Sequence, residues 1–404
     1  METGLTVEEG RDRILALSEA KGTEYVETEF ANGRILSEDI YAQENIPPFD
    51  RSPLDGYALR ARDIKGASGE TPVTLKVIEE VPAGSVPTKE VTEMAAVKIL
   101  TGAPIPKGAD LVVKYEETEF TETEVTFFKP GKSGGNIVPA GEDIRAGQLV
   151  LSKGERITPA VCGIIAGLGR PKVQVYQKPV VAFLSTGSEL ISVGEPLSPG
   201  KIRNSSVYTL KSYLEDVGAE TILLGNVVDD PEEISEKIRS SVDGADMIVT
   251  TGGVSVGDYD FLIRVMEQIG AEILFWKEKL KPGGAFLASV YKGKPVISLS
   301  GNPSAAAVAM ILNVVPAVRK MCGNREFLLK EATAKLAEDY TKSSPNMRIV
   351  PGKLEIREGQ AVAVLSGHSG NGMLHPLHGC NILGRIEAGS KGMKKGNSIS
   401  VYYI

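Results

Sequence analysis

The middle of the chain alternates short apolar runs with segments of helical periodicity. The runs are rich in β-branched residues and have the length of strands; they occupy 180–184, 221–224, 247–250, 273–276 and 296–299. Between most of them, apolar residues recur at a helical spacing, at 207–217, 231–242, 261–269 and 303–321. Strands alternating with helices predict a parallel sheet covered on both faces.

The segments before this α/β region have different patterns. Residues 6–21 predict a helix capped by Thr6, whereas 34–41 fit either a short helix or a strand. Between 45 and 141, strand-like segments are separated by Pro and Gly turns, which predicts a mostly β insertion. Residues 156–168 then predict a second helix, with Pro159 in its first turn.

The last part, 326–404, has short strand-like segments with Gly turns and predicts a small β-barrel or a sandwich. With 404 residues, the chain is long enough for about two to four domains.

Composition and charge narrow the class of protein. The net charge of −7 argues against a general nucleic-acid binder, which needs a basic face. The three cysteines, Cys162, Cys322 and Cys380, form no C-x-x-C pair, so neither a disulfide framework nor a zinc ribbon is expected. The acidic start of the chain does not resemble a signal peptide, and no uninterrupted apolar stretch reaches the length of a membrane span. We therefore expect a cytoplasmic protein without nucleic-acid or membrane partners.

Polar chemistry collects where the five predicted strands end. In an open α/β sheet, ligands bind outside the carboxyl ends of the strands, so five such ends predict a binding cleft. The residues that follow the strands are Ser185-Thr186-Gly187-Ser188-Glu189, then Asp229-Asp230, then the run Thr250-Thr251-Gly252-Gly253-Val254-Ser255-Val256-Gly257-Asp258-Tyr259-Asp260, then Lys277-x-Lys279-x-Lys281-Pro282-Gly283-Gly284, and Ser300-Gly301-Asn302-Pro303-Ser304.

The run at 250–260 has two interpretations. Bare backbone N–H groups at a strand-to-helix turn make an anion site, with a divalent metal between the aspartates and a phosphate. Alternatively, the glycines only permit a tight turn and the aspartates cap the next helix. Oxygen ligands for Mg²⁺ could come from Glu189, Asp229, Asp258 and Asp260, and the residues alone do not decide between these carboxylates.

The three lysines add positive charge to an acidic protein. In an extended segment, alternate residues share a face, so Lys277, Lys279 and Lys281 would point the same way and hold a phosphate or an oxyanion. The alternative is a solvated edge strand that its lysines protect from pairing.

Two rigid loops of the β insertion, 47–58 and 101–110, combine Pro and Gly with aspartates and an arginine. Taken singly, each fits a mere connection, but loops of this kind are also where binding residues concentrate.

Taken together, these segments closely resemble the MoeA family, the molybdopterin molybdotransferases, over nearly the whole chain and in order. Besides the strand ends at 185–190, 250–260, 281–283 and 301–303, the matching motifs are Phe49-Asp50-Arg51-Ser52, Asp55-Gly56-Tyr57-Ala58, Thr101-Gly102-Ala103, Gly108-Ala109-Asp110 and Gly141-Glu142-Asp143-Ile144.

The resemblance implies a multidomain α/β plus β fold with four domains. These are a helical and β hinge domain (1–46 with 141–177), a mostly β inserted domain (47–140), a three-layer α/β molybdopterin-binding domain (178–324) and a C-terminal β-barrel (325–404).

The implied reaction inserts molybdate, or tungstate, into adenylylated molybdopterin with Mg²⁺ and releases AMP. The implied assembly is a homodimer with clefts between subunits, in transient contact with the adenylyltransferase or with molybdopterin synthase. Positions that the family uses for activity are Asp55, Thr101, Asp143, Glu189, Asp229, Asp260, Lys277, Lys281 and Pro282.

The same register assigns molybdopterin binding and metal binding. The metal would be held by Glu189, Asp229 and Asp260, with Asp258 a cap or outer-sphere residue. Cofactor binding falls to Ser185, Thr186, Gly187, Gly252, Gly253, Ser255, Lys279, Pro282, Gly283, Gly301, Asn302, Pro303 and Ser304.

The sequence also departs from the family pattern. Ser300 and Ala305 stand where a proline and a serine are usual, and the motifs around Arg348 and Asn371 are altered, so molybdate contacts from the last domain stay open. Two other functions are considered: an adenylyltransferase that acts one step earlier, and a non-catalytic scaffold like the related gephyrin domain. The two extra β domains count against the first, and the absence of a fused partner domain or a long linker counts against the second.

Overall fold

A computed structural model describes residues 2–254, 261–367 and 370–404. The chain forms two compact units. The larger contains Met1–Ser37, Gly154–Thr158 and Val173–Ile404, and the smaller contains Glu38–Lys153 and Pro159–Lys172. Residues expected in one hinge domain are thus divided between the two units, and the four-domain division stays a prediction.

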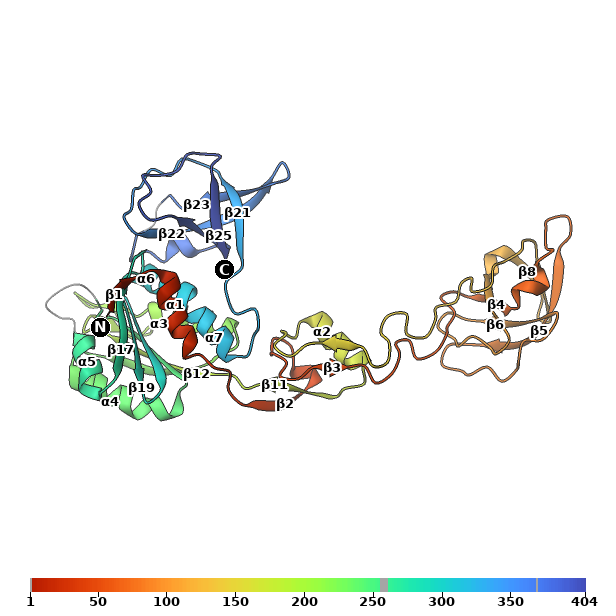
Figure 1. Ribbon diagram of the computed structural model, residues 1–404, viewed down its shortest axis with the longest axis horizontal. Coiled ribbons are helices and arrows are strands. Elements are labelled where there is room, and N and C mark those ends of the chain that lie inside the picture. The colour runs from red at the N-terminus through yellow and green to blue at the C-terminus, as the bar shows by residue number, and fades with distance from the viewer. Residues whose placement is uncertain (1, 255–260, 368–369) are drawn as a thin grey trace. The chain divides into compact units, whose positions relative to one another are not determined.

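A seven-stranded sheet is the centre of the larger unit (Figure 1). All five predicted strands are present and parallel to one another, because β17 and β20 both run antiparallel to the strand between them, β19. The order is β1 (Glu2–Leu5), β17 (Glu272–Glu278), β19 (Phe286–Tyr291), β20 (Lys294–Leu299), β16 (Met247–Thr251), β12 (Val180–Thr186) and β15 (Glu220–Val227).

The prediction missed β19, the strand that runs antiparallel to both of its neighbours. β19 follows the glycine loop at 283–284 and turns back through Lys292-Gly293 to pair with β20, Phe286 opposite Leu299. The prediction also missed β1, which adds to the edge beside β17.

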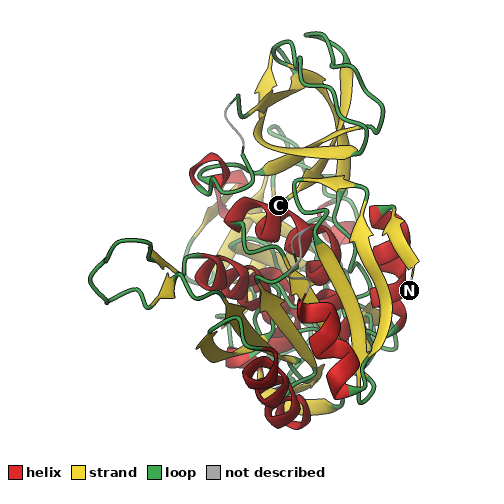
Figure 2. Cartoon of the chain, turned by 90° about the vertical axis from the view of Figure 1, so that its left-hand side faces the viewer, coloured by secondary structure: helices red, strands yellow, loops and turns green. Residues whose placement is uncertain are grey.

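Helices cover both faces of this sheet (Figure 2). Side chains alternate along β12, so that Val181 and Phe183 belong to one apolar core and Ala182 and Leu184 to the other. The first core is closed by α1 (Val7–Ala16), α3 (Ser206–Asp216), α6 (Pro303–Ala309), a π-helical turn (Met310–Val314) and α7 (Val315–Met321). The second is closed by α4 (Pro231–Ser241) and α5 (Phe261–Ile269). This is the predicted three-layer arrangement.

Side-chain caps close the starts of two helices, and the Thr6 cap was predicted. Thr6 and Glu9 form a reciprocal capping box at the start of α1, and the Asp230 carboxylate accepts a hydrogen bond from the Glu232 N–H at the start of α4. Among the described residues, only the helical stretch Pro303–Met321 is long and apolar enough to cross a membrane, and 89% of its window is buried inside the protein. That burial is typical of a core helix.

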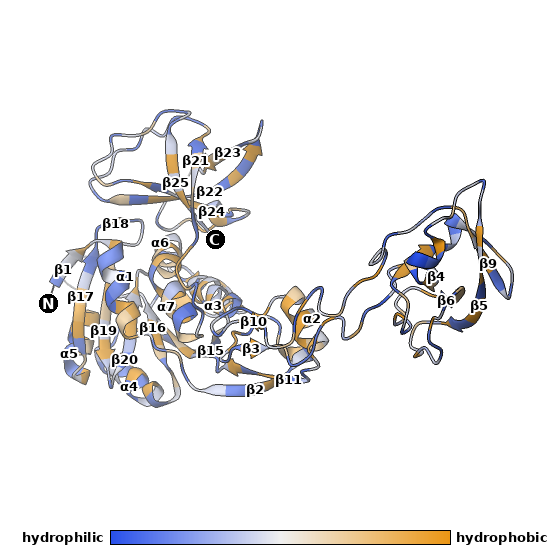
Figure 3. Ribbon diagram, turned by 45° about the vertical axis from the view of Figure 1, so that its right-hand side comes forward, coloured by the Kyte–Doolittle hydropathy of each residue, from blue (hydrophilic) through white to orange (hydrophobic). Residues whose placement is uncertain are grey.

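The C-terminal region is a closed barrel, which decides between the two predicted alternatives. Its strands pair in the circular order β22 (Met347–Arg357), β23 (Gln360–Leu365), β21 (Glu331–Leu336), β25 (Ser398–Tyr403), β24 (Ile382–Ile386) and back to β22. In Figure 3 the strands of this region carry both apolar and polar residues. Buried apolar side chains from different strands, among them Val350, Ala363 and Ile399, form one cluster, as a barrel with a filled interior requires. A short strand from the α/β region, β18 (Leu280–Lys281), pairs with β22.

Shorter elements complete the larger unit. They are the strand pair β2 (Thr23–Glu27) and β11 (Lys172–Tyr176), the pair β13 (Leu190–Ile191) and β14 (Ile202–Arg203), and single 3-10 turns at Thr28–Phe30, Val242–Gly244 and His375–Leu377.

The smaller unit is mostly β, as predicted. Its main sheet has the order β7 (Leu111–Lys114), β4 (Gly56–Leu59), β6 (Ala95–Ile99), β5 (Val73–Val81), β9 (Glu124–Phe127) and β8 (Thr118–Phe120). It also contains the pair β3 (Ile40–Tyr41) and β10 (Leu149–Leu151), the helix α2 (Pro159–Gly167), and 3-10 turns at Ala61–Ile64 and Tyr115–Glu117. The second predicted helix thus begins at Pro159, three residues later than expected, because Arg156 is in a β-bridge with Ile35.

Candidate active site

A cleft of about 750 Å³ opens at the carboxyl ends of the parallel strands. Four of the five predicted strand ends contribute to its wall. The lining residues are Thr186, Gly187, Glu189, Leu190, Ile202, Arg203, Asn204, Ser205, Ser206, Asp229, Thr251, Gly252, Gly253, Val254, Phe261, Ser300, Gly301, Asn302, Pro303 and Gly372. Its volume is typical of a small-molecule site.

Two glycines allow three loops to meet at the floor of the cleft. Gly252 has φ of 97°, and a Cβ at this position would lie 2.3 Å from the carbonyl oxygen of Thr186. A Cβ on Gly301 would lie 3.4 Å from the Cα of Gly252. The Gly252 N–H donates to the Leu299 carbonyl at 3.1 Å, so it is not one of the bare anion-binding groups that the sequence suggested. This glycine serves the turn and the close packing.

Two carboxylates come together on the cleft wall. Burial first, and then the nearby Glu189, raise the pKa of Asp229, while the N–H of Ser188 lowers it by donating a hydrogen bond. The Glu189 carboxylate folds over Gly187, 2.7 Å from where a Cβ would be. Like charges that face each other are stabilised by a cation between them, and carboxylate oxygens suit Mg²⁺. This pair therefore fits part of a metal site.

The rest of the predicted metal site is not described. Asp260, together with Asp258 and Ser255, lies outside the described residues. Within the described part of the chain, no group of three His, Cys, Asp or Glu side chains could hold a metal ion. Asp230 does not join the pair, because its carboxylate caps α4.

Ser185 and Thr186 are buried, with 1% and 3% of their surface exposed. The Ser185 hydroxyl accepts hydrogen bonds from the Asn204 side-chain amide at 2.7 Å and from the Thr251 hydroxyl at 3.2 Å. The same amide donates to Asn226 at 2.7 Å. Ser185 thus holds the cleft loops together from below and does not line the cleft.

The start of α6 is closed by a loop of the C-terminal region. The N–H groups of Ser304 and Ala305 both donate to the Asn371 carbonyl, at 3.0 and 3.2 Å. The hydroxyl of Ser300 accepts from the Asn302 N–H at 3.2 Å. The Asn302 side chain makes no capping bond. The unusual Ser300 therefore supplies a local acceptor, and Asn371 reaches this edge through its backbone.

The lysine segment is in a different place from the one expected. Glu278 and Leu280 are buried while Lys279 and Lys281 are exposed, so exposure alternates as predicted. At Lys277, however, φ is 66° and the ammonium lies 3.6 Å from the centre of the Trp276 ring, a cation–π contact. None of the three lysines lines the cleft, because β19 separates β17 from β20 and β18 continues into the barrel beside Arg348 of β22.

The loop after the lysines packs on α6. Gly283 has φ of 104°, and a Cβ there would lie 3.0 Å from the Ala305 carbonyl oxygen and 3.2 Å from the Ala309 Cβ. Pro282, just before it, is half-buried.

In the smaller unit, Asp55 and Thr101 form one hydrogen-bonded pair. The Thr101 N–H and hydroxyl both donate to the same Asp55 oxygen at 2.7 Å, and these two bonds lower the pKa of Asp55. Both residues are exposed. Asp143 is also exposed, and its N–H donates to the Ile46 carbonyl at 3.0 Å.

Comparison with known proteins finds matches along nearly the whole chain. Three family models match in order: the MoeA N-terminal region (domains I and II) at residues 5–169, a probable molybdopterin binding domain at 182–320, and the MoeA C-terminal region (domain IV) at 333–404. The molybdopterin molybdenumtransferase of Staphylococcus aureus (strain COL) is 37% identical over 98% of this chain and 95% of its own. The chain belongs to the MoeA family.

Other relatives agree. The Staphylococcus epidermidis (strain ATCC 12228) molybdopterin molybdenumtransferase is 37% identical over 99% of this chain and 95% of its own length. The crystal structure of the MoeA protein of Pyrococcus horikoshii OT3 covers 99% of this chain and 100% of its own, with a TM-score of 0.86 at 32% identity. The predictions of a MoeA fold and of a transferase of molybdenum cofactor biosynthesis are confirmed.

For this MoeA protein, the structure brings together Thr186, Gly187, Glu189, Asp229, Gly252, Gly253, Gly301, Asn302 and Pro303 on one cleft. Sequence reasoning missed Asn204, which lines the same cleft. Its side-chain oxygen accepts from the Val207 N–H at 3.3 Å, close to the start of α3. An asparagine just before a helical pattern was a usable capping signal, but nothing in the sequence linked its amide to Ser185.

We expect Gly252→Ala to destabilise the protein. The new Cβ would meet the Thr186 carbonyl at 2.3 Å, and the positive φ adds strain, together about 1–3 kcal/mol of unfolding free energy. Denaturant unfolding measures this, with Gly244→Ala as the control, because a Cβ there has nothing within 4 Å. Equal stability of the two variants would contradict the close approach.

Proposed function

We propose that this chain transfers molybdenum from molybdate to adenylylated molybdopterin and releases AMP, in a reaction that requires Mg²⁺. The observation that carries the proposal is the cleft at the strand ends, which Glu189 and Asp229 both line together with glycine and hydroxyl loops. Family membership supports the substrate class.

The cleft residues divide by chemistry. The loops with Gly187, Gly252, Gly253 and Gly301 let backbone approach a pterin or phosphate closely, and Asn302 offers side-chain hydrogen bonds. Glu189 and Asp229 would hold Mg²⁺, with Asp260 as a further proposed ligand; the ion would neutralise charge on the phosphates. Ser255 stays a proposed contact. Pro303 and the buried Ser304 would fix the entry of α6.

The predicted lysines lie outside the cleft wall. We assign molybdate attraction to Lys277, Lys279 and Lys281, with Pro282 and Gly283 shaping their loop. Tungstate, a tetrahedral dianion of nearly equal size, is an alternative substrate for the same residues. Asp55, Thr101 and Asp143 are proposed to act from the smaller unit, where the Asp55–Thr101 pair presents an ionised carboxylate.

We further propose that the protein works as a homodimer in the cytoplasm and makes transient contact with the adenylyltransferase or molybdopterin synthase that supplies its substrate. Sedimentation equilibrium tests the dimer, and a monomer at micromolar concentration would oppose it.

Incubation with adenylylated molybdopterin, molybdate and Mg²⁺ tests the reaction. AMP should appear in proportion to the enzyme and should require Mg²⁺, since a chelator removes the ion from Glu189 and Asp229. No AMP from correctly loaded substrate would refute the proposal. ATP consumption with bare molybdopterin would point to the earlier adenylylation step.

A further inference from the structure

A second hollow of the larger unit lies away from the strand ends and shares no lining residue with the cleft. Its volume is about 540 Å³, within the range of small-molecule pockets. The wall is formed by Gly154, Glu155, Arg156, Thr158, Arg319, Asn324, Arg325, Glu326, Leu328, Lys330, Tyr403 and Ile404. Four of these side chains are cationic in a protein whose net charge is −7.

Three of the four cations lack an anionic partner. In the ion pairs found among the described residues, none includes Arg156, Arg319 or Arg325. Two acids, Glu155 and Glu326, also line the hollow, and Glu326 binds Lys330 at 3.3 Å. The Arg319 guanidinium donates a long hydrogen bond, 3.4 Å, to the Leu328 carbonyl.

Arg319 is the most constrained of the three. It is half-buried, and burial, followed by the nearby charge of Arg156, lowers the pKa of its guanidinium. A cation in the last turn of α7 also gains from the helix dipole, which explains Arg319 alone. The dipole does not explain why Arg156 and Arg325, from two other segments, converge on the same hollow.

The pocket is built by hydrogen bonds between its walls. The Arg325 N–H donates to the Gly154 carbonyl at 3.1 Å, and the Asn324 N–H donates to the Arg319 carbonyl at 3.0 Å. The Tyr403 N–H donates to the Lys330 carbonyl at 2.9 Å. These hydrogen bonds fix the backbone from which the arginine side chains extend. Ligand binding would therefore not require the backbone to rearrange.

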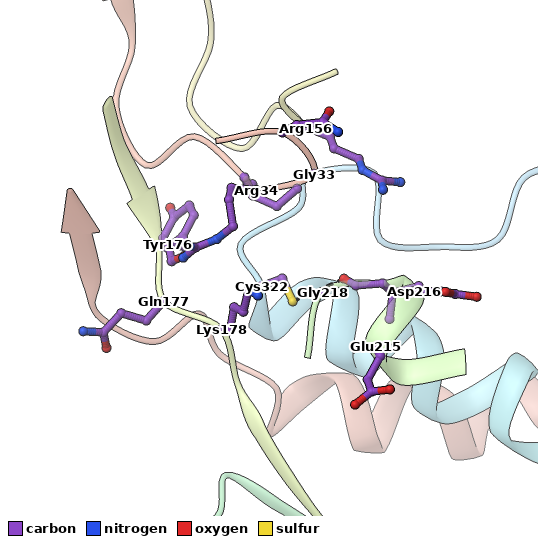
Figure 4. A pocket seen from close by; sticks show the side chains of 13 residues that line it. Gly33, Arg34, Arg156, Tyr176, Gln177, Lys178, Glu215, Asp216, Gly218 and Cys322 are labelled. Carbon is purple, nitrogen blue, oxygen red and sulfur yellow. Dashed lines mark hydrogen bonds between the residues drawn. The ribbon is translucent and has the colours of Figure 1, made fainter. Parts of the chain in front are cut away.

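The neighbouring small pocket has a different charge balance (Figure 4). It measures about 170 Å³ and places Glu215 and Asp216 beside its cations. Arg34 there donates to the Tyr176 carbonyl at 2.7 Å and pairs with Glu24. Figure 4 shows the Arg156 side chain extending away from Arg34 and Tyr176. Arg156 lines both pockets, but Arg319 and Arg325 line only the larger hollow.

We propose that Arg156, Arg319 and Arg325 form a binding site for a phosphate group, either inorganic phosphate or the phosphate of a small nucleotide. Guanidinium forks match tetrahedral oxyanions, and an anion between the three groups would offset their mutual repulsion. At about 540 Å³ the hollow is large enough for a small nucleotide. The site is independent of the reaction proposed for the cleft.

Arginine-specific labelling with phenylglyoxal, mapped by mass spectrometry on the full-length protein, tests the site. At a phosphate concentration about ten times the Kd, labelling of Arg156 and Arg325 should slow about tenfold. The exposed Arg264 of α5 is the internal reference, and chloride keeps the ionic strength constant. AMP in place of phosphate separates the two sources: stronger protection by AMP identifies a nucleotide site, and equal protection identifies a free oxyanion site.

Variants localise the effect. Arg156→Gln changes an exposed side chain, so the fold should persist while protection of Arg325 by phosphate is lost. Lys237→Gln, an exposed cation on α4, should leave that protection unchanged. Unchanged labelling of Arg156 and Arg325 with both anions would overturn the proposal. So would equal protection of Arg264, because it would reveal a general salt effect.

Discussion

We expect Asp229→Asn to reduce the rate of AMP release by about 100-fold or more, the cost of removing one charge that stabilises a reacting phosphate. Asp229 lies on the cleft wall and has Glu189 as its charged neighbour. Asparagine keeps the size and one oxygen but loses the charge that would attract Mg²⁺. The assay follows AMP at increasing Mg²⁺, and the variant should also need more of the ion.

A matched control stands next to it in the chain. Asp230→Asn removes the same charge one residue away, yet asparagine caps a helix as well as aspartate does. This control should retain nearly full activity and stability. If both variants lose activity equally, the loss reflects general charge near α4, and Asp229 is not a metal ligand. If neither loses activity, the carboxylate pair has no part in the reaction.

The sequence predicted the strands because parallel strands are buried on both faces and read as continuous apolar runs. It did not predict the position of β19 between β17 and β20, because pairing order is decided by contacts between distant residues. That one insertion separates the lysines from the cleft. The predicted alternation of exposed lysines with buried residues is present at Lys279 and Lys281. The predicted position of these lysines at the cleft is not, since β18 joins the barrel strand β22 instead of continuing along the sheet.

The cleft shows the same division. Glycines and carboxylates at strand ends follow from chain order and could be predicted. The sequence could not predict which backbone N–H groups are already hydrogen-bonded. The Gly252 N–H, for example, donates to the Leu299 carbonyl across a strand pairing that no local pattern reveals. Asn204 was missed for the same reason, because its partners Ser185 and Asn226 come from two other strands.

A buried glutamate hidden in the lysine segment leads to the second prediction: Glu278→Gln should remove a pH-dependent loss of stability. Only 4% of Glu278 is exposed. One carboxylate oxygen accepts from the Asn313 amide at 3.0 Å, and the other has no partner among the described residues. Burial first, and then the charge of Glu8, raise the pKa of this carboxyl to about 8, against the opposing effects of the Asn313 hydrogen bond and the Arg11 charge.

The sign follows from the two states. The unfolded carboxyl titrates near its ordinary pKa of 4.5, whereas the folded one titrates near 8. Folding therefore takes up a proton between these values, and the free energy of unfolding falls as pH rises through this window. Each pKa unit corresponds to about 1.4 kcal/mol, so the ceiling is about 5 kcal/mol, and with partial solvent relaxation we expect about 2 kcal/mol.

Glutamine has no proton to exchange, and its carbonyl oxygen can still accept from Asn313. At acidic pH the two proteins should therefore have similar thermal midpoints, and above pH 8 the variant should be the more stable. Scanning calorimetry across this range measures the difference, with Glu272→Gln, at the exposed start of the same strand, as the control that should track the wild type. A stability difference that does not change with pH would mean that Glu278 keeps its ordinary pKa. In that case water must reach the carboxylate, directly or after a shift of α1. A buried charge with a single amide partner would otherwise reduce the stability of the folded protein.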